Sequence, residues 1–160
     1  MCNNNVNHPS HYTQYNIEVI ELTSELNFDS GNCAKYILRS PFKGRTYEDL
    51  LKSLWYAKDF VFNSRPSSRT YLKKKAYNKL HDKVIYFEQV AGSLEIPCAK
   101  LFADLLKASF HASIDGKNSP FPSFKDAILN LHSAVNAIEN SDEWKSYVKQ
   151  NESSVDVAAS

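Results

Sequence analysis

Four residues on one predicted helical face carry the clearest chemical signal in this sequence. Asn32, Lys35, Tyr36 and Arg39 are spaced i, i+3, i+4 and i+7, so a helix brings them to the same side. The lysine supplies a point charge, and the arginine supplies a planar fork of donors that suits phosphate oxygens. No acidic residue lies between positions 30 and 46 to neutralise these cations. The face therefore predicts a site for a phosphate attached to a base, with a nucleotide as the first ligand to consider, and the alternative is an ordinary solvated basic face.

The next predicted helix offers a second set of useful side chains. Asp49, Lys52 and Tyr56 are spaced i, i+3 and i+7, and Lys43 precedes them in a loop. We expect Lys43 and Lys52 to close over the phosphate, and Asp49 to orient an acceptor group. Asp49 and Lys52 are also an ordinary helical ion pair, which contributes only a few tenths of a kcal/mol. Tyr56 and its neighbour Trp55 either flank a base or, for Trp55 in particular, pack in the core.

Two groups of residues before these helices are further candidates. His11 and Tyr12 lie in a predicted loop, where a histidine that titrates near neutral pH could move a proton or bind a phosphate. The alternative is an ordinary surface histidine. Glu18 and Glu21 are spaced i, i+3 and are weak candidates for holding magnesium through water. The second carboxylate pair that helical nucleotide pyrophosphatases use is missing, so the sequence requires no metal.

Composition and missing motifs exclude several classes of protein. Lys and Arg total 19 against 18 for Asp and Glu, and this balance argues against nucleic acid as a partner. No run approaches about 18 consecutive apolar residues, so we expect no membrane span and no membrane partner. The three cysteines are widely spaced, which is typical of free thiols in a reducing cytoplasm. Glycine-rich phosphate loops are absent, so any nucleotide chemistry must use side chains on helices.

Apolar residues recur at helical spacing along the whole chain, which predicts an all-α bundle of about six or seven helices without strands. The expected helices cover 17–26, about 30–40, 46–63, 68–94, 98–112, 123–139 and a short segment after Ser141, with caps at Asn16, Asp29 or Ser30, Thr46 and Ser123. A polar break at 63–68 separates a motif-bearing module (1–64) from a helical extension (66–150). We expect the two to pack as one compact domain, followed by a flexible tail (151–160).

An ordered string of motifs covers roughly residues 7–62. It runs His-Pro-Ser-His-Tyr from His8, Gly-Asn-x-x-Lys-Tyr-x-x-Arg from Gly31, Lys-Gly at Lys43, and Asp-Leu-x-Lys-x-x-x-Tyr from Asp49. The string resembles a family of small phage proteins that includes an unusual nucleotide kinase without a Walker motif. The stretch from Ser40 to Phe42 departs from that pattern, which more often has a small residue and a basic run there.

The resemblance implies a phosphoryl transfer from a nucleoside triphosphate to a (deoxy)nucleoside monophosphate, in the cytoplasm of an infected host cell. His11 and Asp49 would be catalytic. The residues expected to bind substrate or phosphate are Tyr12, Asn32, Lys35, Tyr36, Arg39, Lys43, Lys52 and Tyr56. Two alternatives stay open. One is a protein that captures a nucleotide signal without turnover and so blunts a host defence, and the other is a module that binds a host protein through residues 66–150. A homo-oligomer would let Arg39 or Lys43 complete a neighbour's pocket.

Overall fold

The computed structural model describes residues 14–116 and 123–159, and it confirms the predicted all-α bundle. These residues form seven α-helices, one short 3-10 helix and two three-residue strands. His11 and Tyr12 lie outside them. Among the described helices, none combines the length and apolar composition that crossing a membrane requires.

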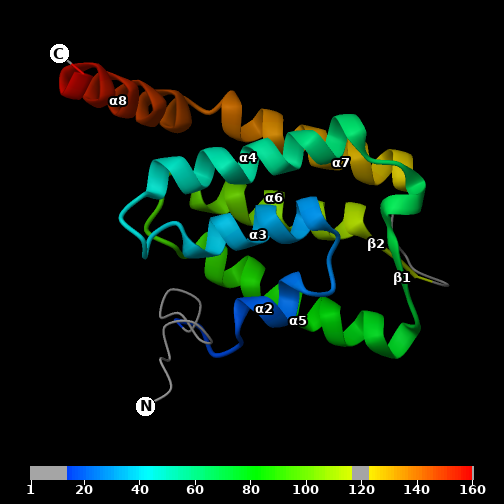
Figure 1. Ribbon diagram of the computed structural model, residues 1–160. Helices are drawn as coiled ribbons and strands as arrows, with labels where there is room; N and C mark the ends of the chain where they lie inside the picture. Colours follow the sequence, from blue (N-terminus) through cyan, green and yellow to red (C-terminus); the bar gives the residue numbers. More distant parts are fainter. Residues whose placement is uncertain (1–13, 117–122, 160) are drawn as a thin grey trace.

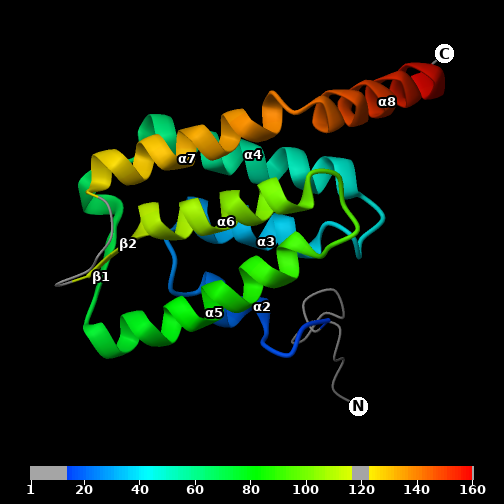
Figure 2. The same cartoon turned by 180° about the vertical axis from the view of Figure 1, so that it is seen from behind.

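The helices stack in three tiers, with α4 and α7 in one, α3 and α6 in the middle, and α2 and α5 in the third (Figure 1). Figure 2 shows the same order from behind, and α8 extends beyond the first tier. The elements are α2 (Val19–Thr23), α3 (Phe28–Arg39), α4 (Thr46–Asn63), η1 (Pro66–Ser68), β1 (Thr70–Leu72), α5 (Lys74–Gly92), α6 (Ala99–Ser113), β2 (Ile114–Gly116), α7 (Phe124–Glu139) and α8 (Asp142–Ala159).

One apolar core lies between the tiers and draws on both halves of the chain. Its largest buried side chains include Phe60 from α4 and Phe87, Phe102 and Phe110 from α5 and α6. Two polar contacts tie α3 to α6 as well. The Ser30 hydroxyl donates to the Ser109 carbonyl at 2.9 Å, and the Asn27 backbone N–H donates to the Ser113 hydroxyl at 2.9 Å. The helix that carries the cationic face is therefore held in the middle of the bundle.

The first two helices begin at residues other than those predicted. α2 is only five residues long, and its N-cap is Glu18, which forms a reciprocal capping box with Glu21 instead of the expected cap at Asn16. α3 is capped by Asn27, whose side-chain oxygen accepts from the Ser30 N–H at 2.9 Å. The prediction of Asp29 or Ser30 as cap is wrong because Asn27 already satisfies an exposed N–H of the first turn.

The predicted absence of strands is also wrong. Thr70, Tyr71 and Leu72 were expected in a long helix over 68–94, but they form β1 and pair in parallel with β2. In the observed register Thr70 faces Ile114 and Leu72 faces Gly116. Each strand has only three residues, and its pairing partner lies more than 40 residues away, so the sequence shows no strand-like alternation that would predict it. The break at 63–68, the helix over 46–63 and the Ser123 cap are confirmed, whereas α8 is longer than the short helix that the sequence predicted.

Candidate functional site

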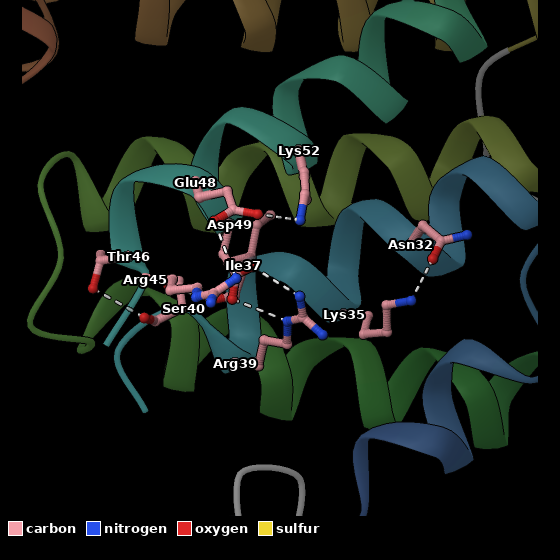
Figure 3. Close-up of polar contacts among 10 residues, drawn as sticks. All are labelled: Asn32, Lys35, Ile37, Arg39, Ser40, Arg45, Thr46, Glu48, Asp49 and Lys52. Carbon is pink, nitrogen blue, oxygen red and sulfur yellow. Dashed lines mark hydrogen bonds and ion pairs between the residues drawn. The ribbon is translucent and has the colours of Figure 1, made fainter. Parts of the chain in front are cut away.

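Packing of α3 against α4 builds the candidate site. The two helices lie side by side and are joined by the short loop over 40–45, so the cationic face of α3 meets the first half of α4 (Figure 3). Thr46 is the first residue of α4, but the prediction that Thr46 caps this helix is wrong, because the N-cap is Arg45 and the Thr46 hydroxyl donates to the Ser40 carbonyl at 3.0 Å instead of bonding to Asp49. The Asp49 side chain is thereby available to α3.

Arg39 and Asp49 form a buried, two-pronged ion pair. Nε of Arg39 donates to Oδ2 of Asp49 at 2.9 Å, and Nη2 donates to Oδ1 at 2.8 Å. The Asp49 side chain is 2% exposed and that of Arg39 is 13% exposed. Lys52, predicted to pair with Asp49, instead donates to Oε1 of Glu48 at 2.6 Å. Both carboxylate oxygens of Asp49 are used by Arg39, so the geometry favours a positioning role for Asp49.

Three cations surround the ring of Tyr36. The Arg39 guanidinium carbon lies 4.3 Å from the ring centroid, and the Nζ atoms of Lys35 and Lys52 lie at 4.7 Å and 5.5 Å. The ring also stacks on Tyr56, with centroids 5.8 Å apart and planes 10° apart. A ring face attracts cations through its quadrupole. We call Lys35, Arg39 and Lys52 around Tyr36 the cation cluster.

Lys35 is the member of the cation cluster without a carboxylate partner among the described residues. Its Nζ donates to the neutral Oδ1 of Asn32 at 2.5 Å, and the Asn32 amide in turn donates to the Phe28 carbonyl at 2.8 Å. Burial lowers the pKa of Lys35, and the neighbouring positive charge of Arg39 lowers it further. An anion at this position would offset the repulsion among the cations, because its negative charge favours the protonated form of Lys35.

Lys35 also lines a groove of about 240 Å³ between α2 and α3. The other lining residues are Ile20, Thr23, Leu26, Asn27, Phe28, Gly31 and Asn32. Gly31 lets the two helices approach closely, since a Cβ atom there would lie 3.1 Å from the Thr23 carbonyl oxygen. Because Lys35 belongs to both, the groove lies beside the cation cluster.

The remaining predicted residues divide into three groups. Lys43 is exposed in the loop before α4. Glu18 and Glu21 are used by the capping box, and Glu21 also accepts from Lys83 at 3.3 Å. Across 14–116 and 123–159 no three His, Cys, Asp or Glu side chains gather where they could hold a metal ion. His11 and Tyr12 precede the described residues.

Two aromatic residues near the candidate site, Trp55 and Phe28, are exposed in ways that we did not predict from the sequence. Trp55 is 60% exposed and lies edge-on to Tyr56 at 5.0 Å, so the alternative that Trp55 packs in the core is wrong. Phe28 is 74% exposed and lies edge-on to the same ring at 5.7 Å. Sequence reasoning missed Phe28, although it stands four residues before Asn32 and thus on the same face as Lys35. That spacing is the signal that could have found it.

One family model is similar to part of this chain, and its description gives no activity. Residues 6–58 match the model of DUF3310, a family described only as a protein of unknown function. The matched segment is about a third of the chain and contains the whole cation cluster, Asp49, Tyr56 and Phe28. Searches of curated proteins and of solved structures found no match. The similarity to the DUF3310 model thus covers the candidate site and leaves the nucleotide-kinase resemblance a prediction.

Proposed function

We propose that this protein binds a nucleotide through its phosphate groups at the cation cluster. The observation that carries the proposal is the state of Lys35, whose ammonium group is partly buried, has a neutral amide as partner and lies beside Arg39. Cations held close together in partly dehydrated surroundings bind a multiply charged anion strongly, because the anion offsets their mutual repulsion. A phosphate group has the charge and the acceptor oxygens for this position.

The contacts support a division of labour between the cations. Arg39 is held by Asp49 and stays in place over Tyr36, so its charge contributes to the field while two of its donors remain with the carboxylate. Lys52 is 41% exposed and pairs with the exposed Glu48. Exposed pairs contribute about 0–1 kcal/mol, so Lys52 can exchange Glu48 for a phosphate at low cost. Lys35 and Lys52 are therefore the direct phosphate ligands in this proposal, with Lys43 as a third cation at the edge.

Binding is tested by calorimetry with a panel of nucleoside mono- and triphosphates. Replacing Lys35 or Lys52 by methionine keeps the aliphatic stem and removes the charge. A charge-assisted hydrogen bond contributes about 1.5–3 kcal/mol, so each variant should lose roughly tenfold or more in affinity. Lys58→Met is the matched control for Lys52→Met, because Lys58 is on α4 as Lys52 is, is 44% exposed and pairs with Glu139. We expect the control to bind as the unchanged protein does.

Two results would contradict the proposal. One is that the unchanged protein binds none of the nucleotides in the panel, even when each nucleotide is present at millimolar concentration. The other is a double variant Lys35→Met/Lys52→Met whose affinity equals that of Lys58→Met, since the phosphate would then lie elsewhere. Circular dichroism of each variant shows whether a loss of binding comes from unfolding.

The kinase that the family resemblance implies would add phosphoryl transfer at the same cations, and the capture protein would not. Phosphoryl transfer depends mainly on positioning and charge stabilisation, which the cation cluster offers. Incubation with ATP, Mg²⁺ and each nucleoside monophosphate separates the two activities. Diphosphate product that is lost in Lys35→Met supports a kinase. Nucleotide recovered unchanged from a saturated complex supports capture.

A further inference from the structure

The aromatic rings at the centre of the candidate site are already engaged. Tyr36 is stacked on Tyr56 and surrounded by the cation cluster. Tyr56 in turn is contacted edge-on by Phe28 and Trp55. The two tyrosines therefore support the cations and the outer rings. A nucleobase needs an exposed ring on which to stack, and Phe28 and Trp55 are the exposed rings of this group.

Phe28 is the exposed ring that shares a groove with a cation. It is the first residue of α3, it is 74% exposed, and it lines the α2–α3 groove together with Lys35. Ile20, which is 61% exposed, lies on the same groove from α2. Large apolar side chains exposed side by side at a concave surface are typical of a binding site. Trp55 lies on α4 instead and does not line this groove.

The size of the groove decides which part of a nucleotide it can take. Pockets that enclose a whole small-molecule ligand have volumes of about 300–1,000 Å³, and this groove has about 240 Å³. It is therefore suited to one part of a nucleotide. The apolar residues Ile20, Leu26 and Phe28 suit the base, and Lys35 at the same groove leads to the phosphate position on the cation cluster.

We propose that the α2–α3 groove is the base subsite of the nucleotide site and that the nucleobase stacks on Phe28. This inference rests on the proposed function, because it takes the phosphate to lie on the cation cluster. Phe28 then contributes affinity for the base, and Lys35 and Lys52 contribute affinity for the phosphates. A ligand without a base should depend on the lysines alone.

The experiment compares a nucleoside triphosphate with inorganic tripolyphosphate, which carries a phosphate chain without a base. Stacking of one base on an aromatic ring accounts for about tenfold in affinity. Phe28→Ala should therefore bind the nucleotide about tenfold more weakly and bind tripolyphosphate within about twofold of the unchanged protein. Phe62→Ala is the matched control, because Phe62 is 73% exposed and lies on α4. It should leave both affinities unchanged.

The outcomes separate this inference from the proposed function. If the unchanged protein binds the nucleotide and Phe28→Ala binds it equally well, the base subsite is overturned and the phosphate site stands. If Trp55→Ala loses the base-dependent affinity instead, the base lies on α4 and this inference is overturned. If the unchanged protein binds neither ligand, both proposals fall.

A second measurement covers a loss of fold in Phe28→Ala. In the unchanged protein, magnetisation transfer from the base protons should reach the Phe28 ring protons. Phe28→Leu, which keeps an apolar side chain without the flat ring, should retain the fold and lose the nucleotide preference. A base that contacts neither the Phe28 ring nor Ile20 overturns the inference.

Discussion

The buried ion pair between Arg39 and Asp49 makes a sharp prediction about stability. Removing the carboxylate in Asp49→Ala takes away the acceptor of two donors, Nε and Nη2, of the Arg39 guanidinium, which is 13% exposed. Breaking one side of a buried pair typically costs about 3–5 kcal/mol. Because Arg39 keeps some access to water, we place the loss near the lower limit, at about 3 kcal/mol. For a chain of this size that loss lowers the melting temperature by about 6–12 °C.

The exposed ion pair between Glu48 and Lys52, which lies next to Asp49 on α4, is the internal control. Lys52 and Glu48 are also in close contact, at 2.6 Å, but their side chains are 41% and 48% exposed. An exposed helical pair of this kind contributes about 0.3–0.5 kcal/mol. The two ion pairs have similar N–O distances, and we expect their interaction energies to differ because only the pair between Arg39 and Asp49 is buried.

Urea unfolding of two double-mutant cycles measures both interaction energies. One cycle replaces Arg39 and Asp49 by alanine, singly and together, and the other does the same for Glu48 and Lys52. We expect a coupling of about 2–3 kcal/mol in the first cycle and below about 0.5 kcal/mol in the second. Equal couplings in the two cycles, or a value under about 1 kcal/mol for Arg39 with Asp49, would refute the reasoning.

Two further predictions concern pH and glycine. Burial, reinforced by the charge of Lys107, lowers the pKa of His111 from 6.5 to about 4. The unfolded chain therefore binds more protons between these values, and the free energy of unfolding should fall by about 2 kcal/mol as the pH drops through this window. His111→Gln should remove that dependence in acid titrations followed by circular dichroism, whereas a variant of the exposed His132 should keep it. Gly44 has a φ of +65°, so Gly44→Ala should lower the free energy of unfolding by about 1 kcal/mol. Gly92→Ala should raise it by about 0.5 kcal/mol, because its new Cβ lies an ordinary 3.8 Å from Cβ of Ala103. Urea midpoints that move in the same direction for both glycine variants would contradict this reasoning.

Local rules predicted the helices that matter for the candidate site. The helix over 46–63 follows from its apolar spacing and matches α4. Lys35, Tyr36 and Arg39 share a face of α3 because side chains three and four residues apart always meet on a helix. These features depend on residues within a few turns of one another, and so the sequence alone is sufficient for them.

Contacts between elements decided the rest. Asp49 had two cations within reach in principle, and only the packing of α3 on α4 determined that Arg39 would take it while Lys52 paired with Glu48. The two short strands depend on the parallel pairing of β1 with β2, which lie far apart in the sequence.

By itself, the sequence determined the helix over 46–63 and the shared face of Lys35 and Arg39, since helix geometry is repeated every few residues. Only the tertiary structure decided which cation is anchored by Asp49, which aromatic rings stay exposed, and that Phe28 and Lys35 line one groove. The physical reason is that burial and partner choice depend on which surfaces meet in space, and no spacing along the chain specifies that.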